Sequence, residues 1–343
     1  MRQFWSEQAR SLTPYVPGEQ PQGQTFIKLN TNENPYPPAP AALAAIRAAA
    51  DGTLRLYPDP ECGVLRQALA ETYGLRPENV FVGNGSDEVL ALCFQAFFDP
   101  GREILFPDVT YSFYPVFAQL YGLDYREVPL NDDFSLPLEP LLGGNGGVVI
   151  ANPNAPTGQA VGLDAVRALL EGNPRAVVLV DEAYVDFGAA SAVELVGEYP
   201  NLVVVQTMSK SRALADGNLI AALHSVKNSF NSYTLDRLAL AGAAGALSEP
   251  DYLRQTAEKI IATRARTTAA LRAMGFQVAD SAANFLFVSH PAVAAKTLLD
   301  GLRARGILVR WWDKPRISNH LRITVGTDGE MDALLSALEE LVP

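Results

Sequence analysis

One lysine of this sequence stands where its side chain could act as a nucleophile. Lys210 follows the apolar, β-branched run 202–205, which has the length and composition of a buried strand. An ammonium group held close to an apolar strand end is poorly solvated, so its pKa falls and the amine becomes available for covalent chemistry. Of the six lysines in the chain, Lys210 alone directly follows a strongly apolar strand. The alternative is a surface lysine in a strand-to-loop turn.

A carboxylate closes another apolar run. Asp181 ends the segment 176–181, AVVLVD, which suits a strand covered on both faces. A buried carboxylate is costly without a cationic or hydrogen-bonding partner, so Asp181 suits a ligand with a protonated nitrogen. Tyr184, three residues further on, could reach the same ligand. The alternative is a core salt bridge with a satisfied tyrosine.

A glycine-rich loop joins a predicted strand to a predicted helix. The segment 83–88, GNGSDE, presents the backbone amides of Ser86 and Asp87 at the beginning of that helix. The helix dipole and the free amides together favour an anion such as a phosphate. An ordinary capped helix explains the same motif when it stands alone.

A proline-bracketed loop supplies a fourth signal. The segment 151–158, ANPNAPTG, follows a predicted strand and places Asn152 and Asn154 near the same sheet edge; alone it is a turn. Lysine, aspartate, anion loop and asparagine loop together suit pyridoxal 5'-phosphate. That cofactor needs an amine for its aldehyde, a carboxylate for its ring nitrogen and donors for its phosphate.

Strands that alternate with helices must position these residues, which predicts an α/β fold with a mostly parallel central sheet flanked by helices. Beyond residue 235 the pattern changes to a smaller C-terminal α/β unit. We therefore expect an N-terminal arm at 1–29, a large cofactor-binding domain at 30–235 and a small domain at 236–343. The sequence predicts strands at 80–83, 103–107, 125–130, 146–153, 176–181, 202–205, 284–290, 307–312 and 321–326, and helices at 40–50, 62–74, 86–98 (capped by Ser86), 112–122, 164–172, 236–248, 248–274 (with a capping box from Ser248 to Asp251), 292–305 and 330–341.

The composition excludes several classes of protein. A net charge of −11 argues against nucleic acid or an anionic membrane as a partner. The two cysteines, Cys62 and Cys93, are too few for a disulfide framework and wrongly spaced for a zinc site, so no metal is expected. The segment 1–12 lacks the apolar core of a signal peptide, and no apolar run approaches the length needed to span a membrane. These features lead us to expect a cytoplasmic protein.

The chain resembles the fold-type I pyridoxal-phosphate aminotransferases, and within them the histidinol-phosphate aminotransferase family, along nearly its whole length. The matching stretches are KLNTNENPYPP, LRLYPDPE, VGNGSDEVL, PDVTYSFYPVF, NPNAPTG, VVLVDEAYVDF, QTMSKSR, VKNSFNSY and LRITVGTDGEMDALL.

This resemblance implies a role for each matching residue. Lys210 binds the cofactor aldehyde and then transfers protons, Asp181 pairs with the ring nitrogen, and Tyr184 bonds the phenolic oxygen. Tyr111 stacks on the ring, while the cofactor phosphate is held by Ser86, Asp87, Ser209 and, from the partner subunit of a homodimer, Tyr57. The substrate's phosphate or carboxylate is bound by Arg310 and Arg322, helped by Tyr15 and Asn32.

Two departures from the family pattern stand out. The residue before the PTG triplet, an asparagine in many relatives, is Ala155, so that Asn154 or Asn152 would have to replace it. The chain also runs from Ala215 directly to Asp216-Gly217, without the Gly-Leu-Arg segment that carries a phosphate-clamping arginine and an antiparallel strand in the family. Because such a deletion would expose a sheet edge, residues omitted from the recorded sequence are the favoured explanation.

The activity that the resemblance implies belongs to histidine biosynthesis. L-Histidinol phosphate and 2-oxoglutarate would be interconverted with imidazole acetol phosphate and L-glutamate. One alternative is an aromatic amino-acid aminotransferase, because an arginine-lined pocket also accepts a carboxylate. Another is a non-catalytic scaffold that lost its cofactor with the missing segment.

Overall fold

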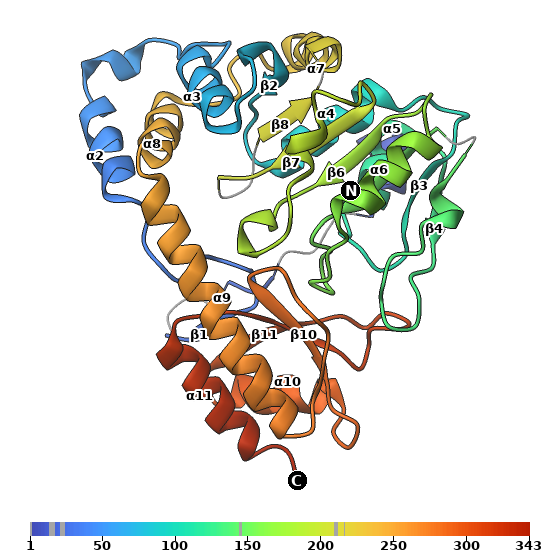
Figure 1. The fold of residues 1–343 in the computed structure, drawn as a ribbon, viewed down its shortest axis with the longest axis vertical. Coiled ribbons are helices and arrows are strands. Elements are labelled where there is room, and N and C mark those ends of the chain that lie inside the picture. Colours follow the sequence, from blue (N-terminus) through green and yellow to red (C-terminus); the bar gives the residue numbers. More distant parts are fainter. Residues whose placement is uncertain (1, 14–17, 21–24, 144–145, 209–211, 216) are drawn as a thin grey trace.

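Two β-sheets, each with its own helices, form the part of the protein described by the computed structural model (Figure 1). That part comprises residues 2–13, 18–20, 25–143, 146–208, 212–215 and 217–343. The residues expected at 14–17 and 209–211, which include Tyr15, Ser209 and Lys210, lie outside it.

The larger sheet has seven strands in the order β2-β8-β7-β6-β5-β3-β4. All neighbours from β7 to β4 are parallel, and β8 alone runs antiparallel to both of its neighbours. The expected mostly parallel sheet is therefore confirmed. The strands are β2 (Val80–Phe81), β3 (Ile104–Pro107), β4 (Tyr125–Val128), β5 (Gly147–Ala151), β6 (Val178–Asp181), β7 (Leu202–Gln206) and β8 (Arg212–Ala215).

Helices cover both faces of this sheet because its central strands are apolar on both sides. Along β7, Leu202 and Val204 pack into one core with α3, α6 and α8, whereas Val203 and Val205 pack into the other with α4, α5 and α7. The helices are α3 (Gly63–Tyr73), α4 (Ser86–Phe97), α5 (Tyr114–Tyr121), α6 (Leu163–Gly172), α7 (Gly217–Phe230) and α8 (Arg237–Leu247).

The strand β8 corrects the expectation of a missing antiparallel strand. Residues Arg212–Ala215 pair with β7 through Gln206↔Arg212 and with β2 through Phe81↔Ala213. The chain's own RALA segment therefore occupies the position beside β7. The sheet therefore has no exposed edge here, and a true deletion no longer conflicts with the fold.

The smaller sheet has five strands in the order β1-β11-β12-β10-β9. Its first strand comes from the N-terminal end, since β1 (Ile27–Leu29) runs parallel to β11 (Ile307–Trp311). The remaining strands are antiparallel, and β9 was not expected from the sequence. The other elements of this part are β9 (Gln277–Val278), β10 (Phe285–Ser289), β12 (Leu321–Thr324), α9 (Pro250–Ala273), α10 (Ala295–Ala304) and α11 (Asp328–Glu339).

The two sheets are linked by the long helix α9, which runs from the neighbourhood of α8 to the smaller sheet (Figure 1). At its upper end α2 (Pro40–Ala49) packs closely on α8, where a Cβ at Gly245 would lie 2.7 Å from the carbonyl oxygen of Ala41. Helix α8, which follows residue 235, also packs on the core of the large sheet. The domain boundary expected at residue 235 therefore stays a prediction.

Two helix starts differ from expectation. Gly85, with φ +90°, is the N-cap of α4, so Ser86 is its first residue and not its cap. Glu249 is the N-cap of α9, because Pro250 occupies the first helical position, and Ser248 instead ends α8. The expected capping box from Ser248 to Asp251 is wrong.

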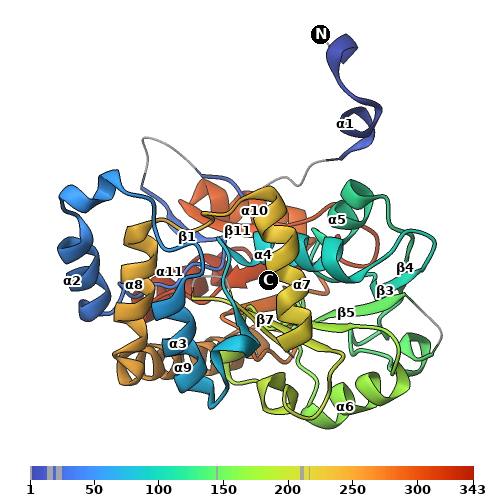
Figure 2. The same ribbon diagram turned by 90° about the horizontal axis from the view of Figure 1, so that it is seen from above.

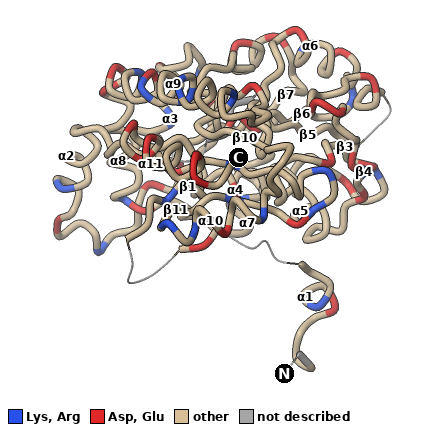
Figure 3. Tube along the Cα trace, turned by 90° about the horizontal axis from the view of Figure 1, so that it is seen from below, with Lys and Arg blue, Asp and Glu red and all other residues tan. Residues whose placement is uncertain are grey.

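The N-terminal helix α1 (Glu7–Ser11) lies outside the two sheets (Figure 2) and buries none of its residues. It touches α5 through Gln8, whose side-chain amide donates to the carbonyl oxygen of Leu120. Acidic and basic residues are spread over both parts of the molecule (Figure 3). No helix among the described residues is long and apolar enough to span a membrane. The short 3-10 helices are Arg2–Phe4, Gly52–Arg55, Pro77–Asn79, Glu139–Leu141, Val185–Phe187 and Ala192–Leu195.

Candidate active site

The carboxyl ends of the parallel strands meet at a cleft. The last residues of β5 and β6, Ala151 and Asp181, are register partners, and Asp181 is in turn the partner of Val205 on β7. The cavity volume of this cleft is about 20 Å³. Four residues singled out in the sequence line it together with Ala151, Pro153, Ala155 and Ala183; they are Ser86, Tyr111, Asp181 and Tyr184.

Asp181 is a buried carboxylate with hydrogen-bond donors on both oxygens. The hydroxyl of Tyr114 donates to its Oδ2 at 2.9 Å, and the backbone N–H of Ala183 donates to its Oδ1 at 3.2 Å. Burial, and then the charge of Asp181, raise the pKa of Tyr114 well above its usual value. Tyr114 therefore keeps its proton and remains a donor to the carboxylate.

Tyr114 was not singled out in the sequence, although a signal for it exists. It is the first residue of α5, three residues after Tyr111, within an otherwise aromatic and apolar segment. Tyr114 is fully buried, and a buried hydroxyl needs a hydrogen-bond partner. The buried carboxylate of Asp181 also needs a hydrogen-bond donor. These two requirements together would have predicted the contact between Tyr114 and Asp181.

Tyr111 forms a wall of the cleft beside the N-terminus of α4. Its hydroxyl donates to Oδ1 of Asp87 at 2.7 Å, and its ring meets that of Tyr114 edge-on at 5.7 Å. Burial and the neighbouring carboxylate of Asp87 raise the pKa of Tyr111, which keeps this donor protonated as well. With the carboxylate of Asp87 held by Tyr111, the backbone amides of the first turn of α4 are the groups suited to bind an anion.

The segment that leads to Lys210 runs along the same helix terminus. Met208 lines a groove together with Gly83, Asn84 and Gly85. Immediately before it, the hydroxyl of Thr207 is buried and has no hydrogen-bond partner among the described residues. Thr207 was missed in the sequence, where the hydroxyl residues before Lys210 were represented by Ser209 alone.

Tyr184 is connected to the smaller sheet through Asn32. The side-chain amide of Asn32 donates to the Tyr184 hydroxyl at 3.0 Å. The hydroxyl of Thr324, on β12, donates to Oδ1 of Asn32 at 3.1 Å and accepts its backbone N–H at 3.0 Å. Asn32, with φ +56°, thus joins the cleft to the strand that also carries Arg322.

The two arginines expected to bind substrate are direct cross-strand partners. Arg310 on β11 and Arg322 on β12 are register partners in the antiparallel ladder. Both guanidinium groups lie over the ring of Trp312, at 5.4 and 5.2 Å, and Arg322 also donates to the carbonyl oxygen of Asn30 at 3.0 Å. Like charges opposite each other are destabilising, so this pair suits an anion.

Asn154 and Tyr57, both expected to bind the cofactor, are not among the residues that line the cleft. Asn154 is committed elsewhere: its amide donates to the Val109 carbonyl and the Thr157 hydroxyl, and its oxygen accepts from Thr110. Ala155 lines the cleft instead, and the amide of Asn152 is bound to the backbone of Val161. The described contacts of Asn152 and Asn154 therefore do not support either of them as the replacement.

Tyr57 is 78% exposed and stacks on Tyr233 at a centroid distance of 4.5 Å, away from the cleft of its own chain. Its expected contact with a partner subunit stays a prediction, as do the roles of Tyr15, Ser209 and Lys210.

The donor set fits pyridoxal 5'-phosphate. A buried carboxylate suits a protonated ring nitrogen, the Tyr184 hydroxyl suits a phenolic oxygen, and Tyr111 offers an aromatic face. At the other end, the amides that open α4 and the unpartnered hydroxyl of Thr207 suit a phosphate. The fold and this cleft define a fold-type I transferase.

Comparison with known proteins agrees. The model of the aminotransferase class I and II family matches residues 24–338. Histidinol-phosphate aminotransferases from Clostridium acetobutylicum and Acetobacter pasteurianus are 50% and 55% identical to this chain; the alignments cover 100% of this chain and 100% and 99% of those proteins. The chain belongs to the aminotransferase class I and II family and, within it, to the histidinol-phosphate aminotransferases.

Solved structures show the same fold. Histidinol-phosphate aminotransferase from Sinorhizobium meliloti, in complex with pyridoxal-5'-phosphate, superposes with a TM-score of 0.89 at 28% identity, covering 99% of this chain and 97% of that one. Aspartate aminotransferase from Thermus thermophilus with maleate superposes with a TM-score of 0.84 at 19% identity, covering 98% and 99%. The second likeness shows the fold alone.

The alignment lengths bear on the junction after Ala215. The alignment with the Clostridium acetobutylicum protein spans 351 positions, whereas this chain has 343 residues. That relative therefore has at least eight residues without a counterpart in this chain. Such a difference agrees with a segment about one strand long missing from the chain; its place after Ala215 stays a prediction.

Proposed function

We propose that the protein transfers the amino group of L-histidinol phosphate to 2-oxoglutarate, giving imidazole acetol phosphate and L-glutamate, in histidine biosynthesis. The observation that carries this proposal is the pairing of Arg310 with Arg322 on strands that are tied to the cofactor cleft through Asn32. A planar guanidinium matches a phosphate or carboxylate with two parallel hydrogen bonds. The pair therefore suits a substrate that carries an anion at one end and an amine at the other.

Asp181, Tyr184 and Lys210 each have a task in this reaction. Bound pyridoxal phosphate supplies an aldehyde that accepts the amino group and a ring that withdraws electrons from the adjacent carbon. Asp181, which accepts from Tyr114 and the Ala183 amide, would hold a proton on the ring nitrogen. Tyr184, oriented by Asn32, would donate to the phenolic oxygen, and Lys210 would take the proton from the amine-bearing carbon.

The experiment that tests the proposal is a comparison of kcat/KM for two amino donors with 2-oxoglutarate as acceptor. We expect histidinol phosphate to exceed phenylalanine by about a hundredfold or more, because a site built for a phosphate is left with unpaired charges by a donor that lacks one. A preference for phenylalanine would overturn the proposal in favour of an aromatic amino-acid aminotransferase. A protein that binds neither pyridoxal phosphate nor either donor would instead be a scaffold.

We also propose that the active form is a homodimer in the cytoplasm. Large apolar side chains are exposed near the groove beside the α4 N-terminus, among them Tyr57 and Val64, exposed by 78% and 77%. Helix α1 of the N-terminal arm contains no buried residue, and Phe4 and Trp5, which precede it, are exposed. A second subunit would cover both regions and bring Tyr57 to the neighbouring cleft.

A mixing experiment tests the shared site. Tyr57→Ala and Lys210→Ala should each impair activity at limiting cofactor. In a mixed dimer one cleft carries both substitutions and the other none, so randomly exchanged subunits should recover about a quarter of wild-type activity. A monomeric mass in sedimentation, or no recovery on mixing, would contradict the dimer with shared sites.

A further inference from the structure

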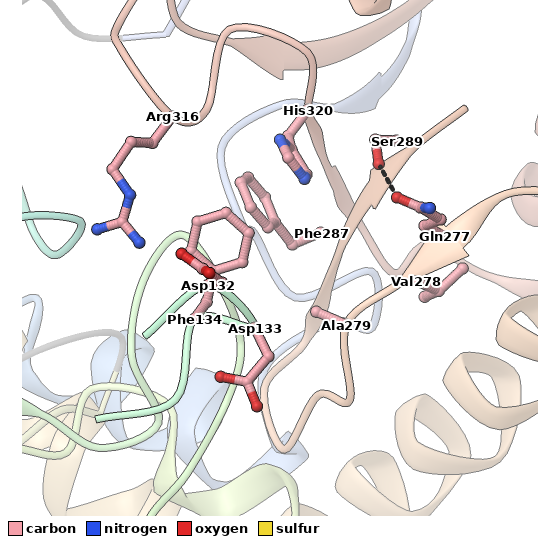
Figure 4. Close-up of a pocket in the computed structure, with 10 residues that line it drawn as sticks. All are labelled: Asp132, Asp133, Phe134, Gln277, Val278, Ala279, Phe287, Ser289, Arg316 and His320. Carbon is pink, nitrogen blue, oxygen red and sulfur yellow. Dashed lines mark hydrogen bonds between the residues drawn. The ribbon is translucent and has the colours of Figure 1, made fainter. Parts of the chain in front are cut away.

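The loop between β11 and β12 reaches from the smaller sheet to the large one. It spans residues 312–320 and carries Arg316 at its centre, six residues after Arg310 and six before Arg322. Arg316 lines one side of a groove together with Phe134 of the large part and His320 of the same loop (Figure 4). The groove lies where the two parts of the molecule meet.

Arg316 is bound by three acceptors, all of them in the large part. Its guanidinium donates to Oδ2 of Asp108 at 2.6 Å and to the carbonyl oxygens of Leu130 and Asn131 at 2.8 and 3.0 Å. It also lies over the ring of Phe134 at 5.8 Å. The two charged side chains are only 31% and 21% exposed, so solvent screens the pair less than it screens a typical surface ion pair.

Two further features show how specifically the loop is seated. Arg316 has φ +68°, a left-handed conformation that is uncommon for a residue with a side chain. Its neighbour Ile317 is buried against Val109, Leu130 and Phe287. The loop is thus attached by apolar and aromatic contacts, among them the edge-on contact of His320 with Phe134, and by a charged clasp, the ion pair of Arg316 with Asp108. The clasp is formed by a residue whose backbone conformation would suit glycine better.

The clasp connects the proposed substrate-anion site, formed by Arg310 and Arg322, with the cofactor cleft. On the small side, Trp312 at the beginning of the loop lies against the guanidinium groups of both Arg310 and Arg322. On the large side, Asp108 lies just after β3 and three residues before Tyr111, which forms a wall of the cleft. The second carboxylate oxygen of Asp108 accepts the backbone N–H of Leu130 at 2.9 Å, which holds that carboxylate in place.

We propose that Arg316 is a positioning residue that fixes the distance between the paired arginines and the cofactor cleft. It does not touch the reacting atoms; it acts through the loop and Trp312. A substrate is then selected by the spacing between its anion and its amine. This inference rests on the proposed function, because it assumes that Arg310 and Arg322 bind the substrate anion.

Steady-state kinetics of the holoenzyme test the inference. In Arg316→Gln we expect KM for histidinol phosphate to rise about tenfold while kcat stays within about twofold, since loosening the support of a binding residue weakens binding more than chemistry. Arg316→Lys, which keeps the charge but not the planar fork, should give a smaller rise. Asp108→Asn should raise KM in the same way, and the double variant should be no worse than Arg316→Gln alone, because both changes break one contact.

A matched control separates positioning from general stability. Arg272 also pairs with one carboxylate and one carbonyl, those of Asp280 and Val278, but entirely within the smaller part. Arg272→Gln should leave KM unchanged. If Arg316→Gln lowers the melting temperature but leaves KM at the wild-type value, the inference is overturned; Asp108→Asn and Arg316→Lys give the same decision should Arg316→Gln fail to fold.

A second readout does not depend on the identity of the substrate. The dissociation constant of inorganic phosphate, measured by tryptophan fluorescence, should rise about tenfold in Arg316→Gln, because the loop that Arg316 anchors also carries Trp312, whose ring lies against both arginines. An unchanged phosphate affinity contradicts the role of Arg316 even if wild-type turnover of histidinol phosphate is normal. Conversely, absent turnover with weakened phosphate binding in the variant would reject the proposed substrate and keep the role of Arg316.

Discussion

The cofactor cleft and the arginine pair hold their polar groups in opposite ways. In the cleft, donors and acceptors satisfy one another: Tyr114 donates to Asp181, Tyr111 to Asp87, and Asn32 to Tyr184. On β11 and β12, Arg310 and Arg322 instead present two like charges directly across the ladder. The side chains named in the first region are held by contacts within the protein, whereas the two adjacent cations of the second favour the binding of an anion.

Removing Lys210, the proposed nucleophile, should give the largest effect, because none of the described residues that line the cleft carries an amine. Lys210→Ala is expected to lower turnover by at least about a thousandfold. Single-turnover kinetics with histidinol phosphate measure this loss. Near-normal turnover in the variant would mean that another residue carries the chemistry, and the assignment of Lys210 would be wrong.

Removing one charge of the arginine pair should weaken substrate binding. In Arg322→Gln we expect KM for histidinol phosphate to rise about a hundredfold, in line with the loss of a buried charge-assisted contact. Arg322→Lys should not restore it, because lysine lacks the planar fork.

The control for this change is Arg305→Gln, which removes a guanidinium bound to Glu340 elsewhere in the smaller part. If KM for histidinol phosphate is the same in Arg322→Gln and the wild type, the arginine pair has a structural role only.

Removing one hydroxyl from the cleft should have a smaller effect. Tyr114→Phe leaves Asp181 without one of its donors, and a hydrogen bond to a charged group contributes about 1.5–3 kcal/mol. Without this donor the Asp181 carboxylate is less well oriented and should hold the proton on the ring nitrogen less firmly. We therefore expect kcat to fall about tenfold and the pH titration of the visible absorption of the holoenzyme to shift.

Tyr121→Phe on the same helix serves as the comparison, and the absorption titration should not move in it. Identical titrations for Tyr114→Phe and wild type would leave Tyr114 with a packing role only.

The smallest effect on catalysis is expected at Glu182, the carboxylate next to Asp181. Burial raises the pKa of Glu182 to about 7, although Ser191, Gln206 and the Ala192 amide all donate to it. The folded protein then keeps this proton up to about pH 7, whereas the unfolded chain releases it near 4.5. The free energy of unfolding should therefore fall as pH rises through this window, by up to about 3 kcal/mol.

Chemical denaturation at pH 5 and pH 8 measures that slope. Glu182→Gln should flatten it, and the exposed Glu194→Gln should not. A slope that persists unchanged in Glu182→Gln would show that other groups cause the pH dependence.

Patterns within single strands and helices predicted the site residues whose positions depend on one such element. The apolar run before Asp181 and the glycines before Ser86 indicated a strand end and a helix start, and both residues line the cleft. The contact from Asn32 to Tyr184 joins residues 152 positions apart, and that from Thr324 to Asn32 joins residues 292 apart. No spacing rule within one element reports such contacts.

The strand β8 was missed for a different reason. Its RALA sequence is dominated by residues that favour helices, and it becomes a strand because β2 and β7 pair with it on both sides. Tertiary pairing here overrides local preference. The cap of α4 was misplaced by one residue, at Ser86, because Gly85 can adopt the positive φ that precedes the helix.

The measurement that tests the central claim most directly is the visible absorption spectrum of the protein loaded with pyridoxal phosphate, before and after addition of histidinol phosphate. We expect the absorption of lysine-bound cofactor to be present at the start, to bleach on addition of histidinol phosphate and to return on addition of 2-oxoglutarate. A spectrum that ignores histidinol phosphate, or a protein that stays colourless in the presence of the cofactor, would contradict the joint assignment of the cleft and the arginine pair.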